Sequence, residues 1–521
     1  MKRFINCLSA GILLLAMPCM LFSQQNTFTS VFYDPYGAVG GSGAVQSPDS
    51  TYLIAGEKDY IGLIIKMDPY GYNLWEKQYD FSGQISFFTR IFRTHDEQFI
   101  TVGSLNYDYG NGDILCMKLD ETGDTVWSRS INFGTHEYAT YVQETSDHGF
   151  IISGCGSTSP YDPQMLVIKL DSAGNMQWGK TISGETNSIA HSVKEAPDGG
   201  FYVIGGTRNS TGWDTKALLV KLTAAGELEW STQFVSGASS SDGYDVIVSN
   251  SGLICLIESS LGTLLVKTDL EANVLWSKGY WAGSSWSFYN HSQMPKLHQT
   301  ADGGFAFSTS GQFGTLFRLD SSGLIEWYAE LMVESSDVIE TLDRGFLVVG
   351  NGPLMGVEMG PTFNPQIGML KTDSLGNTDN CVFTGLGSAD TTTVSFIPVT
   401  LTPGNGGTVE EMHPVISDPS IIRYSGCVAM TWSIDELEPE NPQLIVSPNP
   451  SDGRMQISLV QETHVKVGVK IFNLTGSQVW SSPNDLQLPA QLDLSFLPNG
   501  IYFIMSESEG SVYTQRFIII R

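Results

Sequence analysis

The sequence has few basic residues, few cysteines and no long apolar stretch after its first 23 residues. Its 521 residues include 27 lysines and arginines against 55 aspartates and glutamates, a formal net charge of −28 at pH 7. This excess of negative charge disfavours a polyanionic partner, so we expect no nucleic-acid binding. No later apolar run reaches the roughly 20 residues that span a bilayer, so we expect no transmembrane segment in the mature chain.

Motifs of the common enzyme classes are also missing. The sequence contains no Gly-x-Ser-x-Gly elbow, no His-Glu-x-x-His, no Gly-Lys-Thr phosphate loop and no Cys-x-x-Cys pair. We therefore expect no cofactor. The residues Asn106, Asp108, Asn111 and Asp113 have a loosely Ca²⁺-like spacing of oxygen ligands, but the terminal bidentate glutamate is missing, so Ca²⁺ binding stays an open alternative.

The seven cysteines are too few for a disulfide scaffold in a chain of this size. Cys116, Cys155 and Cys255 lie in apolar, strand-like runs, so we expect buried thiols there. Cys381 and Cys427 flank one irregular segment, and a disulfide between them is left open.

The chain begins with a basic pair and an apolar stretch that closes at Ser23. This pattern is typical of a secretory signal peptide over residues 1–23, with cleavage after Ser23. Pro18 stands before Cys19, where a lipoprotein signal needs a small residue, so lipidation is disfavoured. We expect a secreted chain.

An internal repeat organises residues 24–380. A Lys-Leu-Asp-x-x-Gly-x-x-x-Trp signature starts at seven positions, 46 to 53 residues apart. The seven copies are KMDPYGYNLW at Lys66, KLDETGDTVW at Lys118, KLDSAGNMQW at Lys169, KLTAAGELEW at Lys221, KTDLEANVLW at Lys267, RLDSSGLIEW at Arg318 and KTDSLGNTDN at Lys371. A second, turn-forming signature precedes each copy; in the third, DHGFIISG from Asp147 lies 22 residues before Lys169.

Each unit reads as four short strands joined by tight turns, with a tryptophan large enough to wedge between neighbouring sheets. Seven such units predict an all-β fold, a seven-bladed β-propeller over residues 24–380. The seventh copy lacks its tryptophan strand, and we expect the run from Phe28 to Tyr33 to complete it, so that no blade keeps an open edge.

The signature also resembles the repeats of quinoprotein-type propellers, over residues 27–380. The resemblance implies the fold alone, because the adjacent Cys-Cys pair that many quinoprotein dehydrogenases place beside their cofactor is missing.

Two further segments follow the repeats. Residues 381–441 contain Thr, Gly and Pro clusters and an acidic stretch, which predicts a linker or irregular β segment. Residues 442–521 alternate apolar strands with Asn-Pro, Thr-Gly and Asn-Gly turns, which predicts a small Ig-like β-sandwich.

This last module carries a set of turn and strand residues at particular spacings: Pro448, Asn449, Pro450, Gly453, Ile471, Asn473, Gly476, Leu497, Gly500, Ile501 and Tyr502. In these residues it resembles the type A C-terminal sorting domain of the type IX secretion system of Bacteroidetes. The resemblance implies the type IX secretion machinery as a partner and a secreted or outer cell-surface location. The alternative is an ordinary terminal module with no sorting role.

In a propeller, the loops between the second and third strands of a blade and the loops between blades share one face. These loops are unusually aromatic here, and their rings could stack on apolar ligand faces while polar neighbours such as His136, Glu137, His191 and Asp242 orient the ligand. The ligand-binding candidates are Tyr107, Tyr109, Tyr161, Trp213, Trp286, Tyr289 and His291. The alternative is that each ring only caps its own loop.

Two hypotheses of function follow. The first is a secreted or cell-surface, non-enzymatic protein that binds an extracellular ligand, a glycan or a protein. The second is a secreted hydrolase or lyase that acts on polysaccharide at the central channel, which would need inward-facing carboxyl groups with raised pKa. Fold alone cannot choose, since propellers serve both roles.

Overall fold

The structure is a computed structural model. The chain forms two compact units, Met1–Met430 and Thr431–Arg521. The described residues form antiparallel sheets and turns, with no helix among them, which confirms the predicted all-β class. They are 27–33, 38–106, 112–134, 136–156, 163–183, 186–208, 215–235, 238, 240–260, 262–280, 295–309, 314–331, 333–351, 366–378, 383–385, 389–391, 395–398, 402–406, 408–417, 422–425, 444–447, 453–459, 466–473, 478–482, 485–498, 500–508 and 511–519.

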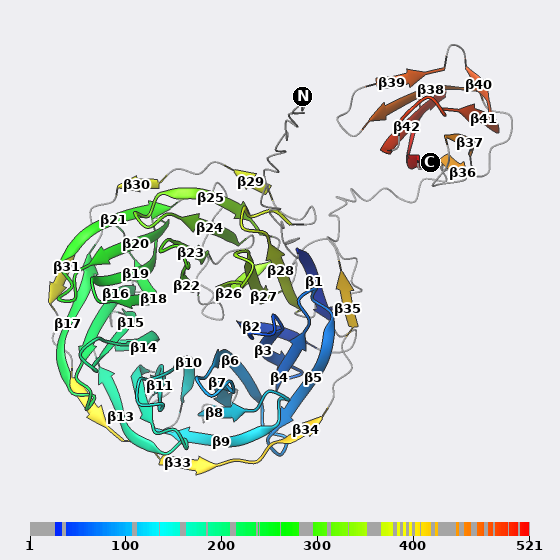
Figure 1. The fold of residues 1–521 in the computed structure, drawn as a ribbon. Helices are drawn as coiled ribbons and strands as arrows, with labels where there is room; N and C mark the ends of the chain where they lie inside the picture. The colour runs from blue at the N-terminus through cyan, green and yellow to red at the C-terminus, as the bar shows by residue number, and fades with distance from the viewer. Residues whose placement is uncertain are drawn as a thin grey trace, which may run out of the picture. The chain divides into compact units, whose positions relative to one another are not determined.

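The first unit contains seven five-stranded sheets, which lie around a common centre in Figure 1. Sheet 1 contains β2 (Val39–Gln46), β3 (Tyr52–Lys58), β4 (Ile61–Met67), β5 (Asn73–Asp80) and β34 (Val415–Ser417). Sheet 2 contains β6 (Ser86–Arg93), β7 (Phe99–Leu105), β8 (Asp113–Leu119), β9 (Thr125–Asn132) and β33 (Thr408–Glu411). Sheet 3 contains β10 (Tyr138–Glu144), β11 (Phe150–Gly156), β12 (Gln164–Leu170), β13 (Met176–Ser183) and β32 (Thr402–Asn405).

The other four sheets repeat this order. Sheet 4 contains β14 (Thr186–Glu195), β15 (Phe201–Arg208), β16 (Thr215–Leu222), β17 (Leu228–Val235) and β31 (Ser395–Pro398). Sheet 5 contains β18 (Ser241–Ser249), β19 (Gly252–Ser259), β20 (Gly262–Thr268), β21 (Val274–Tyr280) and β30 (Ala389–Thr391). Sheet 6 contains β22 (Leu297–Gln299), β23 (Phe305–Ser308), β24 (Thr315–Leu319), β25 (Ile325–Glu330) and β29 (Phe383–Gly385). Sheet 7 contains β26 (Glu334–Glu340), β27 (Phe346–Asn351), β28 (Ile367–Thr372), β1 (Phe28–Tyr33) and β35 (Ile422–Ser425).

In five of the seven sheets the two repeated signatures meet through an ion pair. In sheet 3, Asp147 sits in the turn between β10 and β11 and accepts a hydrogen bond from Gly149 N (3.0 Å), while Lys169 Nζ on β12 lies 2.9 Å from its carboxylate. The same pair recurs as Lys118–Asp96, Lys221–Asp198, Arg318–Asp302 and Lys371–Asp343. The fixed spacing of the two signatures therefore reflects a direct contact between them.

The tryptophan carried by six of the seven copies packs against the following sheet, as predicted. Trp75 of sheet 1 lies so close to the β8–β9 turn of sheet 2 that a Cβ added to Gly123 would lie 2.5 Å from the indole. Equivalent pairs are Trp127 with Gly174, Trp178 with Gly226, Trp276 with Gly323 and Trp327 with Gly376.

The strand β1 takes the outer position of sheet 7. It pairs with β28, and Phe28 lies opposite Lys371, the register at which Trp178 lies opposite Lys169 in sheet 3. Phe28 also packs on Gly71 of sheet 1, where an added Cβ would lie 2.7 Å from the phenyl ring. The expected role of residues 28–33 in completing the seventh repeat is therefore seen in the strand pairing.

Residues 383–425 add a fifth strand to every sheet. The strands β29 to β35 pair in turn with the outer strands of sheets 6, 5, 4, 3, 2, 1 and 7, so the segment follows the outside of the array against the chain order of the sheets (Figure 1). We call these strands the outer belt. The sequence predicts only a linker or irregular β segment here, because strands of three or four residues carry little periodic pattern.

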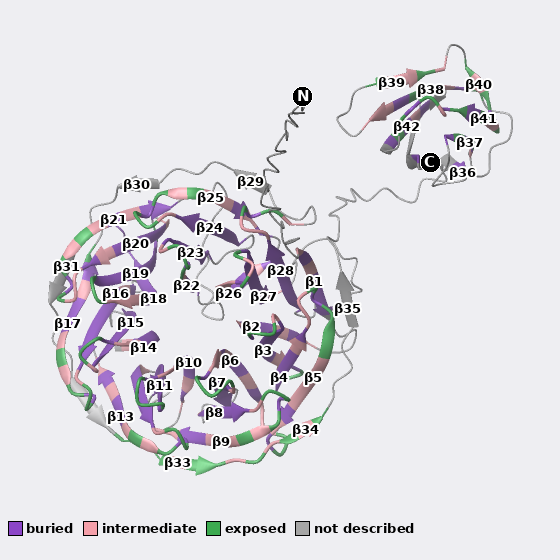
Figure 2. Ribbon diagram, in the orientation of Figure 1, coloured by how far each residue is buried: buried purple, intermediate pink, exposed green. Residues whose placement is uncertain are grey.

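Seven apolar clusters hold consecutive sheets together. Each cluster draws buried side chains from two neighbouring sheets, and one joins sheet 7 to sheet 1 through residues such as Phe32, Met369 and Ile54. Burial is most continuous on the second and third strands of the sheets, such as β7, β8 and β11, while exposed residues gather in turns and on the outer strands (Figure 2).

The second unit has two antiparallel sheets. One contains β36 (Leu444–Ser447), β37 (Arg454–Leu459) and β41 (Ala490–Asp493). The other contains β39 (Gln478–Ser481), β38 (Lys466–Asn473), β42 (Gly500–Ser508) and β43 (Ser511–Ile519), with β40 (Leu486–Gln487) paired to β38. Both sheets contribute to one core, in which Ile457, Ile471 and Ile504 are fully buried.

The cysteines of the first unit behave as predicted where the structure describes them. Cys116, Cys155 and Cys255 are buried, free thiols. Burial raises the pKa of the Cys155 thiol to about 12. Cys381 and Cys427 lie outside the described residues, so the disulfide between them stays untested.

Candidate functional site

All seven aromatic and histidine candidates lie outside the part of the chain that the structure describes. They are Tyr107, Tyr109, Tyr161, Trp213, Trp286, Tyr289 and His291. The strands that flank their segments are described, and they include the β7–β8, β11–β12 and β15–β16 pairs. The site prediction therefore stays a prediction, and the described geometry draws attention to another place, the centre of the array.

Two of the predicted polar neighbours form a buried pair on adjacent inner strands. His191 of β14 and Asp242 of β18 are 1% and 3% exposed, and His191 Nε2 lies 3.3 Å from Asp242 Oδ1. The imidazole also stacks on Tyr244 with ring centroids 4.9 Å apart. These side chains are part of the packed interior and do not line an open face.

The innermost strands share a local distortion. The pairing register of the innermost strand shifts in six of the described sheets, between Gly41 and Gly43, Phe88 and Arg90, Ala139 and Tyr141, Ala190 and Ser192, Gly243 and Asp245, and Ser335 and Asp337. Such β-bulges bend a strand and redirect its side chains. Because they recur at one level, their redirected residues meet.

The bulges also join neighbouring sheets by hydrogen bonds. Thr89 Oγ1 donates to Ala139 O (2.8 Å), and Thr140 Oγ1 donates to Ala190 O (2.6 Å). Each hydroxyl thus reaches the inner strand of the following sheet. A small hydroxyl residue at the bulge is therefore a structural feature of the array.

Five polar side chains near these bulges, together with Lys296 before β22, form one group in the interior, which we call the central charge cluster. It consists of Arg90 (β6), Tyr141 (β10), Lys194 (β14), Asp245 (β18), Lys296 (just before β22) and Asp337 (β26). Six sheets therefore contribute one residue each. The cluster holds three cations and two carboxylates, in a chain whose formal net charge is −28.

The two carboxylates are held by backbone donors as well as by cations. Asp337 pairs with Arg90 and accepts hydrogen bonds from Ala44 N and Val338 N, each at 2.9 Å. The contact with Ala44 N links sheet 7 to sheet 1, so the cluster spans the two ends of the repeat array.

Asp245 is held in a similar way. It accepts hydrogen bonds from Ser192 Oγ (2.6 Å), Val246 N (2.9 Å) and Leu297 N (3.1 Å). These partners come from sheets 4, 5 and 6. Fixed donors of this kind favour the ionised carboxylate.

The three cations surround the ring of Tyr141. Lys194 Nζ lies 4.0 Å from the ring centroid, Lys296 Nζ 5.1 Å and the Arg90 guanidinium carbon 5.5 Å. Lys194 also donates a hydrogen bond to the Tyr141 hydroxyl. An aromatic ring stabilises nearby cations through its negative face, which offsets part of their mutual repulsion.

The pKa shifts follow from burial and from this arrangement of charge. Burial lowers the pKa of Lys296 to about 8, and the positive charges of Arg90 and Lys194 act in the same direction against the attraction of Asp245. Burial alone would raise the pKa of Asp245, but Lys194 and Lys296 outweigh it, and the pKa is lowered. Asp245 is therefore held as a carboxylate, and Lys296 is a buried lysine whose pKa lies well below its ordinary value.

The sequence carried one signal for this cluster. Four members of the cluster stand six residues before the turn aspartate of the second signature. They are Arg90, Tyr141, Lys296 and Asp337. The shared position of these four residues becomes visible only when the seven copies are aligned.

The weak Ca²⁺ pattern is only partly described. Asp113 accepts hydrogen bonds from Ser130 Oγ and Asn132 Nδ2, both at 2.7 Å. Asp108 and Asn111 lie outside the described residues. Asp113 therefore has partners of its own on the neighbouring strand β9.

Comparison with known proteins identifies the end of the chain. Residues 446–520 match the family of secretion system C-terminal sorting domains. This confirms the resemblance to secreted Bacteroidetes proteins with a type IX sorting domain, and it overrules the alternative of a terminal module with no sorting role. The protein is thus exported by the type IX secretion machinery to the cell surface or the surrounding medium.

The comparisons show less for the rest of the chain. No curated protein matches the chain. It is similar to a protein of unknown function from Bacteroides caccae, with 11% identity over 58% of this chain and 94% of that chain and a TM-score of 0.33. A likeness at this level carries no argument. Among the described residues, no helix is long and apolar enough to cross a membrane.

Proposed function

We propose that the first unit is a closed seven-bladed β-propeller that binds an extracellular ligand, a glycan or a protein, without catalysing a reaction. Export to the cell surface or medium gives such a protein access to extracellular ligands. For the second unit we propose an Ig-like sandwich, supported by its two antiparallel sheets around one core.

The contacts between sheet 7 and sheet 1 support closure. Leu342 N in sheet 7 donates to Gln46 Oε1 in sheet 1 at 2.7 Å, as Ala301 N donates to Glu340 between sheets 6 and 7 at 2.7 Å. The same kind of junction thus joins the last sheet to the first. With Phe28 on Gly71, it leaves neither end of the array without a neighbour.

The order of the strands supports a shared ligand face. Each sheet is an antiparallel meander, so the segments between its second and third strands begin at the same edge as the segments that lead to the next sheet. Trp213 stands in a segment of the first kind, and Trp286 and Tyr289 in one of the second kind. This common edge is the observation that carries the proposal, because one ligand could contact several rings there.

The rival hypothesis, a hydrolase or lyase at the centre, finds less support. It needs a carboxyl group whose pKa is raised so that it can donate a proton. The pKa of Asp245 is lowered, since Lys194 and Lys296 outweigh the effect of burial. Asp245 is also 2% exposed, which leaves little access for a substrate.

The test is a glycan and polysaccharide array probed with the protein lacking residues 1–23. A variant with Trp213→Ala, Trp286→Ala and Tyr289→Ala removes three rings of the proposed face. A control variant with Tyr70→Ala and Tyr72→Ala removes two exposed rings from the β4–β5 turn, at the opposite edge of sheet 1.

The proposal predicts binding by the parent and the control and loss of binding in the three-ring variant. Equal binding by all three proteins would refute the aromatic face. Binding of no glycan directs the same comparison to a panel of extracellular proteins, and turnover of a bound polysaccharide would overturn the non-enzymatic function.

A further inference from the structure

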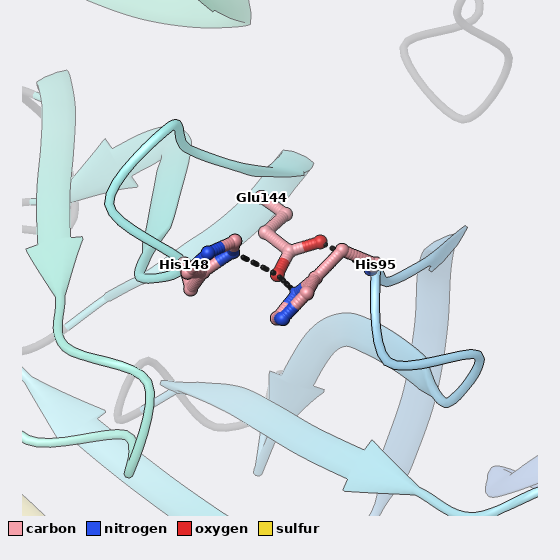
Figure 3. A group of neighbouring side chains, drawn as sticks. All are labelled: His95, Glu144 and His148. Carbon is pink, nitrogen blue, oxygen red and sulfur yellow. Dashed lines mark hydrogen bonds and ion pairs between the residues drawn. The ribbon is translucent and has the colours of Figure 1, made fainter.

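The turns at the opposite edge of sheets 2 and 3 bring together two histidines and a glutamate, outside the central charge cluster (Figure 3). His95 belongs to the β6–β7 turn, Glu144 ends β10, and His148 belongs to the β10–β11 turn. One ligand atom from each of the three side chains lies within 4.8 Å of the others.

The contacts in this group centre on one carboxylate oxygen. Glu144 Oε1 contacts His95 Nδ1 and lies 3.7 Å from His148 Nδ1, and Figure 3 shows both imidazoles turned toward it. The two rings stack with their centroids 3.7 Å apart. The histidine side chains are 50% and 56% exposed, so a small solute can reach them from solvent.

The other oxygen of Glu144 is held by the fold. Glu144 Oε2 accepts a hydrogen bond from His95 N at 2.7 Å. Glu195 and Glu340 accept the equivalent backbone hydrogen bond at two other junctions, from Ser146 N and Ala301 N. The carboxylate is thus positioned by a contact that the array uses repeatedly.

The two histidines are not required by that contact. Sheet 6 forms the same turn with Ala301 and Gly303 at the positions that His95 and His148 occupy in their own turns. His148 even has a positive φ of 63°, a conformation that suits glycine better than histidine. The structure of the turn therefore does not explain why imidazoles stand here.

We propose that His95, Glu144 and His148 bind a divalent transition metal ion, with Zn²⁺ as the best fit. Two imidazole nitrogens and one carboxylate oxygen are a three-residue ligand set that Zn²⁺ accepts, with water in the fourth position. Metal–ligand bonds of about 2.0–2.1 Å at tetrahedral angles place ligand atoms about 3.4 Å apart. The 3.7 Å between His148 Nδ1 and Glu144 Oε1 is close to this separation, and His95 needs only a small ring shift.

The bound ion would connect sheet 2 to sheet 3 and would stabilise the folded array by mass action. It would also replace the contact between His95 and Glu144 by two bonds to the metal. Lower pH should weaken binding, because protons compete for the imidazole nitrogens.

The test uses the full protein after chelator treatment, titrated with ZnCl₂ by isothermal calorimetry, with the melting temperature as a second readout. His95→Ala and His148→Gly bring in the residues that sheet 6 carries at these positions, so both variants should fold. Glu144→Gln keeps an acceptor for His95 N, as Gln46 accepts from Leu342 N elsewhere. His413→Ala removes an exposed histidine outside the group and is the matched control.

We expect one Zn²⁺ per protein with micromolar affinity, a higher melting temperature with Zn²⁺, and at least tenfold weaker binding in each of the three site variants. His413→Ala should bind like the parent protein. Absence of binding at millimolar Zn²⁺, or binding that the site variants leave unchanged, would overturn the proposal.

Discussion

Phe28 lies on Gly71, so that a side chain from the start of the repeat region covers the β4–β5 turn of sheet 1, as a tryptophan covers the equivalent turn at other junctions. Phe28 stands opposite Lys371 on β28, and Trp75 stands opposite Lys66 on β4. One aromatic residue per junction is thus maintained even where the seventh copy of the signature lacks its tryptophan.

Phe28→Ala should destabilise the first unit through this junction. Phe28 is 6% exposed, and a buried phenylalanine truncated to alanine costs about 3–5 kcal/mol. Denaturant unfolding followed by tryptophan fluorescence measures the loss. Leu74→Ala on the exposed face of β5 is the control and should change stability by less than about 0.5 kcal/mol. An equal effect of both substitutions would contradict a sealing role for Phe28.

Gly123→Ala tests the docking of tryptophan on the following sheet. Gly123 has φ of 81°, and an added Cβ would lie 2.5 Å from the indole of Trp75. We expect a cost of about 1–2 kcal/mol from the backbone and about 1–3 kcal/mol from the clash. Gly199→Ala is matched, since Gly199 also has φ of 81° but no atom within 4 Å of its added Cβ. Gly199→Ala should therefore lose stability only through its backbone conformation. Equal losses of stability in the two variants would argue against close packing of Trp75 on Gly123.

The central charge cluster should make stability depend on alkaline pH through Lys296. The pKa of Lys296 is lowered to about 8 in the folded protein, below the value of about 10.4 for a free lysine. Between these values the unfolded chain binds more protons, so the free energy of unfolding rises with pH. From pH 7.5 to pH 10, the free energy of unfolding of the parent protein should rise by on the order of 2 kcal/mol relative to that of Lys296→Met.

Urea unfolding of both proteins across this range measures the effect. Lys58→Met is a control, because Lys58 lies outside the cluster on β3. A parallel pH dependence of the parent and Lys296→Met would show that Lys296 does not titrate in this window.

The buried thiols should be unreactive while the protein is folded. Burial raises the pKa of Cys155 to about 12, and Cys116 and Cys255 are shifted in the same direction by the same cause. Since the thiolate is the reactive form, iodoacetamide at pH 8 should leave all three unlabelled. Mass spectrometry of peptides before and after unfolding gives the result. Rapid labelling of any of the three in the native protein would contradict the packing of the inner sheets.

The sequence could predict the parts of the fold that repeat. Trp178, Gly226 and the Lys169–Asp147 pair belong to signatures that recur seven times, so their structural role can be recognised without knowledge of the contacts. The strand at Phe28 could also be predicted, because the seventh copy lacks a strand that the N-terminal run can supply.

The outer belt could not be predicted from its own residues. Its strands have three or four residues each, and β33 and β34 are largely exposed. The fourth strand of each sheet presents an unpaired edge, and the strands of the outer belt pair with these edges. Such an edge exists only once the sheets have formed. The local sequence pattern of residues 383–425 therefore says little about where these strands pair.

The central charge cluster was missed for a related reason. Arg90, Lys194 and Asp337 read singly as polar positions of half-buried strands. Their meeting depends on bulges at one level in three separate strands, β6, β14 and β26, and a bulge has no sequence signature of its own here. The aromatic candidates could be predicted from the sequence, because they gather in segments between strands. A binding measurement is what tests them.

The most direct test of the central functional claim is to measure the dissociation constants of three proteins for one ligand. That ligand is the one that the parent protein binds most tightly on the glycan and polysaccharide array. The proteins are the parent, the variant with Trp213, Trp286 and Tyr289 changed to alanine, and the control with Tyr70 and Tyr72 changed to alanine. We predict that the three-ring variant binds at least 100-fold more weakly, at about 1 kcal/mol or more for each lost aromatic contact, while the control matches the parent. Equal affinity of the three-ring variant and the parent would contradict the proposed face.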